Sequence, residues 1–215
     1  MLYDFTVGRL GGLVRAGIHY ARARGVRTTL AKAMDLYVAG QQTWHVIRED
    51  LAHPAPAGPE GSSLDVRFAR PDDLDWLAAL GHVDRATLAE WMGADYFMFV
   101  AFRAGRPVGF RCVCRRAPPW VADWFRLRPD QLYGVDVFTV PEQRRSGLAR
   151  AIFARTSPML HARGFTELLG VQRLDNVDSI AALARSGFTR LGRLTRRRRL
   201  WRVTYAFVED TAATA

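Results

Sequence analysis

Short apolar stretches, some alternating with polar residues, recur along the chain at the length and spacing of β-strands. The expected strands are Thr43 to Leu51, Leu64 to Phe68, Tyr96 to Arg103, Pro107 to Arg115, Leu132 to Val140, Leu168 to Val171 and Leu200 to Phe207. Helical spacing predicts helices over Asp72 to Leu80, Ala86 to Met92, Gly147 to Arg163 and Ser179 to Arg185. This order favours a mixed α/β fold in which helices cover the faces of one sheet.

The first part of the chain differs from the rest. Residues 8–38 read as helical and basic, with no acidic residue between Arg9 and Lys32. Such a segment is either an ordinary helix packed on its own domain or an amphipathic helix lying on an anionic membrane surface.

A stretch rich in Pro, Gly and Ser, Ala52 to Ser63, has the composition of a linker. We therefore expect three segments. A basic helical extension with one strand covers residues 1–52, a linker covers 53–63, and the main domain covers 64–210.

Composition adds less than the pattern does. A length of 215 residues and a hydrophobic share of 49% allow a full-sized core and argue against wholesale disorder. The net charge of +10 favours an anionic partner. The basic residues are almost all arginine, with Lys32 as the exception. A GC-rich coding sequence produces the same bias, so the charge alone does not specify a partner.

Cys112 and Cys114 share one face of an expected strand, where a disulfide between them is geometrically awkward. Without further Cys or suitably spaced His we expect reduced thiols in a cytosolic protein and no metal site. The early acid Asp4 and the arginines that follow it argue against a signal peptide, and no stretch approaches the roughly 20 apolar residues of a membrane span. The expected location is cytoplasmic, with contact of residues 8–38 to the inner membrane face as an alternative.

The segment PEQRRSGLARAIF, Pro141 to Phe153, joins an expected strand to an expected helix. The first N–H groups of a helix lack intrahelical partners, and the helix dipole is positive there, which suits phosphate oxygens. Gly147 allows close approach of a ligand, and Arg144 and Arg145 can add charge-assisted hydrogen bonds. The junction is therefore either a pyrophosphate site or an ordinary polar loop.

Two motifs resemble those of the GNAT superfamily, the CoA-dependent N-acyltransferases. Arg144-Arg145-Ser146-Gly147-Leu148-Ala149 resembles the Arg/Gln-x-x-Gly-x-Gly/Ala motif of that family. The segment from Asn176 to Gly187-Phe188 resembles its Asn-to-Gly-Phe signature, with the expected spacing. The resemblance covers residues 64–208 and implies a mostly antiparallel central sheet flanked by helices.

The resemblance also implies roles for particular residues. The backbone of Phe138, Thr139 and Val140 would pair with the pantetheine arm of acetyl-CoA or another acyl-CoA. Backbone amides from Arg144 to Ala149 would hold the pyrophosphate: Arg144, Arg145, Ser146, Gly147, Leu148 and Ala149. Asn176 would lie near the pantetheine. An amine would attack the acyl carbonyl directly, which needs a deprotonated amine and an aligned thioester.

One position departs from the family. Leu183 stands where the family commonly has a tyrosine general acid. Either another group serves, or positioning alone carries the rate, or the protein is a catalytically silent acyl-CoA sensor. Asp136 and then Tyr133 are the candidate catalytic residues, because both lie on the strand before the loop. His82 and His161 are expected to be surface residues.

The sequence gives the least information about the amine acceptor. The arginine run Arg196 to Arg199 comes just before the expected last strand, and in the family the final hairpin often borders the acceptor site. The run therefore indicates either an anionic amine acceptor or a solvated charge run. Trp120, Trp124 and Phe125 belong to a lid, a homodimer contact, a membrane contact or a loop folded on the core. No stacking pattern for nucleic acid is present, so no nucleic-acid partner is expected.

Overall fold

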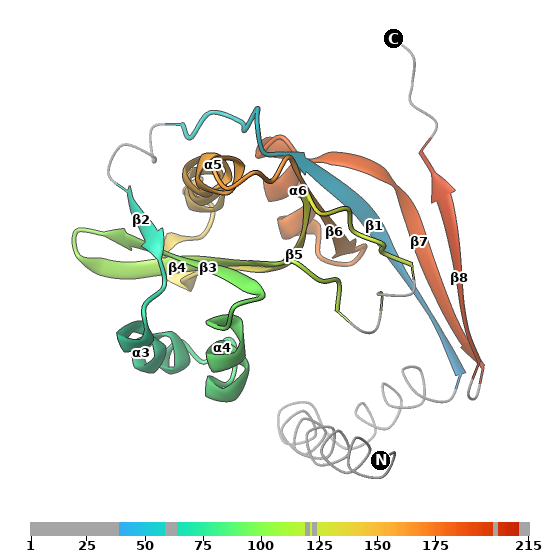
Figure 1. Cartoon of the computed structure of the whole chain (residues 1–215), viewed down its shortest axis with the longest axis horizontal. Helices are drawn as coiled ribbons and strands as arrows, with labels where there is room; N and C mark the ends of the chain where they lie inside the picture. Colours follow the sequence, from blue (N-terminus) through green and yellow to red (C-terminus); the bar gives the residue numbers. More distant parts are fainter. Residues whose placement is uncertain (1–38, 59–63, 119–120, 122–123, 200–201, 211–215) are drawn as a thin grey trace. The chain divides into compact units, whose positions relative to one another are not determined.

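The computed structural model describes residues 39–58, 64–118, 121, 124–199 and 202–210 (Figure 1). The helices expected over residues 8–38 and the side chain of Trp120 lie outside this part of the chain. The described strands are β1 Ala39–Asp50, β2 Leu64–Phe68, β3 Tyr96–Arg103, β4 Arg106–Cys114, β5 Gln131–Thr139, β6 Glu167–Arg173, β7 Thr189–Arg199 and β8 Arg202–Glu209. The helices are α3 Leu74–Ala79, α4 Arg85–Trp91, α5 Leu148–His161 and α6 Val177–Arg185, with 3₁₀ turns η2 Pro71–Asp73 and η3 Pro141–Gln143.

The strands form one 8-stranded sheet in the order β2-β3-β4-β5-β6-β1-β7-β8. Strands β2 to β5 pair antiparallel in succession, β1 pairs antiparallel with β6, and β5 and β6 are parallel. The mixed, mostly antiparallel sheet that the sequence predicts is confirmed. The tight β3–β4 turn has positive φ at Ala104 (50°) and Gly105 (74°), the geometry that matches the twist of a two-residue hairpin.

The described residues divide into two compact units. Residues 44–193 and 208–210 belong to one, and residues 39–43, 194–199 and 202–207 belong to the other. Strand β1 lies in the sheet beside β6. The division at residues 53–63 inferred from composition stays a prediction.

In the larger unit, helices cover the two faces of the sheet. Leu148, Ala151 and Ile152 of α5 pack with β2, β3 and β4 residues on one face. Leu77 of α3 and Leu88 of α4 pack with Met98, Val100, Phe110 and Phe138 on the other. Figure 1 shows α5 on the opposite side of β3 and β4 from α3 and α4. The two faces therefore carry separate apolar clusters, as a sheet buried on both sides requires.

The parallel pair β5–β6 is short. Its register joins Gln131, Leu132 and Tyr133 to Glu167, Leu168 and Leu169. Strand β5 continues to Thr139 and β6 to Arg173 without further pairing between them in the described chain. We call the point where they separate the fork. One arm of the fork is β4 with β5, and the other is β6 with β1.

Strand β7 differs from the expectation. Residues 189–199, including the run Arg196 to Arg199, form a strand that is not among the expected strands, although the run does precede the final strand β8 as the sequence predicts. Arg197 Nε donates to Gln41 Oε1 at 3.0 Å. Basic residues at the exposed positions obscure the apolar alternation, so strand pairing and not periodicity defines β7.

The described residues contain no helix long and apolar enough to cross a membrane. They also contain no group of three or more His, Cys, Asp or Glu side chains placed to hold a metal ion. Both cysteines are free and buried.

Candidate functional site

A cavity of about 270 Å³ lies at the fork and is lined from both of its arms. Asp136 and Cys112 come from the β4–β5 arm, and Gly170 and Gln172 come from β6. The lining also includes Phe153 of α5 on one face of the sheet and His82 of the α3–α4 loop on the other. The cavity therefore lies between the separated strands and is lined from both faces of the sheet.

Asp136 and His82 form the main polar pair of this cavity. His82 Nε2 lies 2.9 Å from Asp136 Oδ2, and the two side chains are 36% and 29% exposed. A histidine held by a carboxylate in this way is oriented and keeps its second ring nitrogen for another partner. The pair can accept a proton from a group that enters the cavity.

The local sequence explains why this pair forms. The register between β4 and β5 shifts at Cys112 and Val113, where Asp136 and Gly134 are the successive partners, so Val135 is the extra residue of a β-bulge. His82 stacks on Phe138 with ring centroids 4.4 Å apart, which holds the imidazole against the strand that carries Asp136. Two residues after His82, Asp84 caps α4 by accepting from Thr87 N at 3.0 Å and anchors the loop.

The loop before α5 has the backbone of an anion site. Arg145 and Gly147 have positive φ values of 63° and 87°, and Gly147 is the N-cap of α5. Left-handed residues around a turn direct successive N–H groups towards one side, as in anion-binding nests. Ser146 Oγ donates to Gln143 O at 2.8 Å, which fixes the loop on η3. The exposed Arg144 and Arg145 flank the first turn of α5, where backbone N–H groups lack intrahelical partners.

Near the end of β5, one edge of the strand is paired with β4. Phe138 and Thr139 pair with Phe110 and Gly109 of β4, and Val140 N donates to Val108 O at 3.0 Å. The other edge faces the fork, where the described β6 has already separated. A ligand with amide groups can pair with this edge as a further strand would.

Asn176 lines the cavity at the start of α6. Its side chain caps the helix by accepting from Ser179 N at 3.2 Å. Ser179 Oγ in turn donates to Gln172 Oε1 at 2.9 Å. Asn176 therefore caps α6 at the cavity wall, in addition to the ligand contact that the sequence predicts for it.

Tyr133 and His161 lie apart from this cavity. Tyr133 is buried, and its ring packs edge-on against Phe125 at 5.4 Å. Burial raises the pKa of the Tyr133 hydroxyl above its ordinary value. Phe125 thus belongs to a loop folded on the core, one of the four alternatives for that segment. His161 is exposed, and its Nδ1 lies 3.2 Å from Phe165 O.

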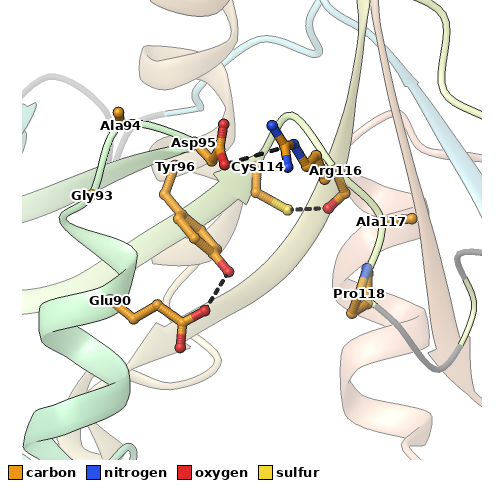
Figure 2. Close-up of a pocket in the computed structure, with 9 residues that line it drawn as sticks. All are labelled: Glu90, Gly93, Ala94, Asp95, Tyr96, Cys114, Arg116, Ala117 and Pro118. Atoms are coloured by element: carbon orange, nitrogen blue, oxygen red, sulfur yellow. Dashed lines mark hydrogen bonds and ion pairs between the residues drawn. The ribbon is translucent and has the colours of Figure 1, made fainter. Parts of the chain in front are cut away.

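A second cavity of about 450 Å³ lies at the ends of β3 and β4 (Figure 2). Tyr96 donates to Glu90 Oε1 at 3.0 Å, and Arg116 lies 3.6 Å from Asp95. Cys114 lines this cavity and Cys112 the fork cavity. Since residues i and i+2 of a strand share a face, the two cysteines lie on the same face of β4.

Residues 64–188 match the model of the acetyltransferase (GNAT) family. The match covers more than half of the chain, so the protein belongs to this family and is of the class of acyl-CoA-dependent N-acetyltransferases. No curated protein matches the chain.

Solved structures with the same fold are distant in sequence. A Drosophila protein is 14% identical over 81% of this chain and 56% of its own, with a TM-score of 0.51. The ribosomal-protein-S18-alanine N-acetyltransferase of Escherichia coli is 20% identical over 56% of this chain and 74% of its own, with a TM-score of 0.47. An aminoglycoside 6′-N-acetyltransferase of Acinetobacter haemolyticus is 18% identical over 58% and 90%, with a TM-score of 0.47. At these identities the likeness concerns the fold.

The structure brings together part of the predicted site. Asp136 and Asn176 line one cavity, and Leu183 lies in its wall. His82, expected at the surface, lines the same cavity and contacts Asp136. A single histidine in a polar loop has no periodic signal, and only the contact between distant segments reveals it.

Proposed function

We propose that the fork cavity transfers an acyl group from acyl-CoA to an amine by direct attack, with the His82–Asp136 pair as the base. The observation that carries this proposal is the 2.9 Å contact between His82 Nε2 and Asp136 Oδ2 in the wall of that cavity. The family membership supplies the reaction class. Acetyl-CoA is the first acyl donor to be tested.

The chain's own features fit an acyl-CoA. The open edge of β5 beyond Tyr133 offers backbone groups to the amides of a pantetheine arm. The left-handed backbone at Arg145 and Gly147 and the start of α5 suit a pyrophosphate. Asn176 lines the fork cavity. The thioester supplies an activated acyl carbonyl when it is bound there.

In the proposed mechanism His82 acts through Nδ1. Because a carboxylate can only accept, the tautomer that fits the contact with Asp136 has Nε2–H as the donor and the lone pair on Nδ1. As the amine nitrogen forms its bond to the acyl carbon, the amine proton passes to Nδ1, and the carbon–sulfur bond then breaks to release the CoA thiolate. The imidazolium that results is stabilised by Asp136 and can return the proton to the thiolate. This route uses no donor at Leu183, which is 7% exposed and apolar.

The sensor alternative keeps the same binding site and omits the transfer. Leu183 is the observation that favours it, because leucine cannot supply the proton that the family's tyrosine commonly gives. The acceptor's predicted anionic character, contact of residues 8–38 with a membrane and assembly as a homodimer all remain proposals of the sequence analysis.

The test combines calorimetric titration of acetyl-CoA with a thiol-release assay over a broad amine panel. Acyl transfer predicts binding and thiol release by the wild type, with turnover strongly reduced in Asp136→Asn and His82→Gln. Binding without thiol release for any amine supports the sensor. No binding of acetyl-CoA at about millimolar concentration, the weak end of ordinary ligand affinities, contradicts both.

A further inference from the structure

A buried ion pair lies at the fork and has no part in the proposed chemistry. Arg111 Nη2 donates to Glu49 Oε2 at 2.5 Å, and the two side chains are 2% and 3% exposed. Arg111 Nη1 also donates to Thr156 Oγ1 at 2.7 Å and to Ser157 Oγ at 3.0 Å. The Ser157 hydroxyl donates to the other carboxylate oxygen of Glu49. Every charged group of the cluster therefore has hydrogen-bond partners.

This cluster joins the two arms of the fork. Arg111 is on β4 and Glu49 is on β1, and the sheet order places β5 and β6 between them. Thr156 and Ser157 lie on α5, which packs on the same face of the sheet. Beyond Tyr133 and Leu169 the described β5 and β6 no longer pair. Glu49 is opposite Leu168, where β5 and β6 still pair, whereas Arg111 is opposite Val137, beyond the paired segment. The ion pair thus spans the point where the two strands separate.

The cluster also borders the fork cavity. Arg111 is among the residues that line it, together with Phe153, whose ring lies 4.8 Å from the guanidinium carbon. Burial lowers the pKa of Arg111 from its ordinary value, while the adjacent Glu49 acts in the opposite direction. Buried ion pairs can often be replaced by apolar residues of similar volume without loss of stability. The need for stability alone therefore does not account for this pair.

We propose that Arg111 and Glu49 are positioning residues that hold the two arms at the separation required by the acyl-pantetheine part of acyl-CoA. This inference rests on the proposed function, since it assigns the fork to that ligand. It concerns the width of the cleft and not the anchoring of the nucleotide at the loop before α5. The pair therefore affects binding of the acyl-pantetheine part and leaves nucleotide binding unchanged.

The test compares two ligands in the full-length protein. Acetyl-CoA and 3′-phospho-ADP, the nucleotide half of CoA, are titrated into the wild type and into the double variant Glu49→Leu/Arg111→Met. We expect the variant to bind acetyl-CoA about tenfold more weakly and 3′-phospho-ADP with unchanged affinity. Leu64→Ala is the control, because Leu64 is buried on β2, which the sheet order places three strands from β5. This control variant should have lower stability than the wild type but the same ratio of affinities for acetyl-CoA and 3′-phospho-ADP.

Every outcome of this comparison either supports or overturns the positioning role of Arg111 and Glu49. A folded double variant with the wild-type ratio of affinities overturns the positioning role. If the double variant shows no cooperative thermal transition, Glu49→Gln replaces it, since glutamine keeps the shape and one acceptor oxygen but removes the charge; an unchanged ratio there also overturns the inference. If the wild type binds acetyl-CoA and a folded variant keeps the wild-type ratio, this inference fails alone. If the wild type binds 3′-phospho-ADP but not acetyl-CoA, or binds neither ligand, the proposed function fails together with this inference.

Discussion

His82 and Asp136 are 54 residues apart in the sequence, and His82 Nε2 lies 2.9 Å from Asp136 Oδ2. The first lies between α3 and α4, and the second lies on β5 beside its bulge. Because both line the fork cavity, they can act together on a bound amine. In the proposed mechanism this pair receives the amine proton, whereas the loop before α5 holds the pyrophosphate, so the first prediction treats turnover and acetyl-CoA affinity separately.

Replacing Asp136 with Asn should lower kcat about 100-fold, the usual scale for loss of acid–base assistance. The imidazole then loses the carboxylate that orients it and stabilises its protonated form. Affinity for acetyl-CoA should stay near the wild-type value. Thiol release and calorimetry on the same samples measure the two quantities.

A matched control comes from a second His–Asp pair. His53 Nδ1 lies 3.1 Å from Asp50 Oδ2 in an exposed position that does not line the fork cavity. His53→Gln should leave kcat unchanged. An equal loss in both variants would argue that the effect of Asp136 is not specific to the site.

Substitution of Gly147 by Ala should weaken acetyl-CoA binding by about tenfold. Its φ of 87° lies in a region where a side chain costs about 1–2 kcal/mol, so the loop before α5 must change its backbone. Gly164→Ala is the control, since Gly164 has a φ of 89° after α5 and open space around it. It should show a similar loss of unfolding free energy and normal binding of acetyl-CoA; weakened binding in both variants would contradict a specific role of the loop.

The Arg111–Glu49 pair should show strong coupling in stability. Arg111→Met alone leaves Glu49 buried and unpaired, which should cost about 3–5 kcal/mol of unfolding free energy. The double variant with Glu49→Leu should recover most of this loss. A double-mutant cycle in urea measures the coupling, and additive losses would show that the two charges do not depend on each other.

Acid should remove one defined contribution to stability. Arg67 donates to both oxygens of Asp73 at 2.7 Å and is the main cause that lowers the pKa of Asp73 to about 2. A carboxylate with a lowered folded-state pKa stabilises the protein fully above its unfolded-state pKa, and this stability is lost as the pH falls towards about 2. For this shift the contribution is about 2 kcal/mol.

Urea unfolding of the wild type and Asp73→Asn measures this effect. The difference in unfolding free energy between them should be largest near neutral pH and should narrow below about pH 4. A difference that does not depend on pH would assign the loss to packing or to the hydrogen bond that Asp73 accepts from Arg70 N.

The cysteine thiols should react slowly in the native protein. Burial raises the pKa of Cys114 to about 11 and that of Cys112 further above its ordinary value, so little thiolate exists at neutral pH. A thiol reagent should modify both residues rapidly only after unfolding. Rapid modification of the folded protein that acetyl-CoA prevents would show that Cys112 is accessible from the fork cavity.

The sequence predicted most of the local structure. The expected strand Tyr96 to Arg103 matches β3, and helix α5 begins at Leu148, one residue after the expected start at Gly147. Both follow from local rules, namely apolar periodicity and the conformational freedom of glycine. The sheet class and the acetyltransferase family are confirmed.

Features that depend on distant contacts escaped prediction. His82 becomes a site residue because it meets Asp136, and Arg111 becomes buried because Glu49 and α5 provide its partners. Neither residue has a neighbour in sequence that reveals this. Strand β7 was obscured by its arginines, since an exposed strand position tolerates charge and removes the apolar signal.

The fork leaves an unpaired strand edge inside the sheet and not at its rim. Strand β5 from Gly134 to Thr139 has backbone groups on that side which the described β6 does not take. Unpaired edges attract other extended chains and promote aggregation, and a ligand that binds only the folded form raises stability in proportion to the logarithm of its concentration. Acyl-CoA pairing with this edge would then also protect the protein from self-association. In a cell, the pool of acyl-CoA would in this way govern how much of the protein persists as well as how fast it works.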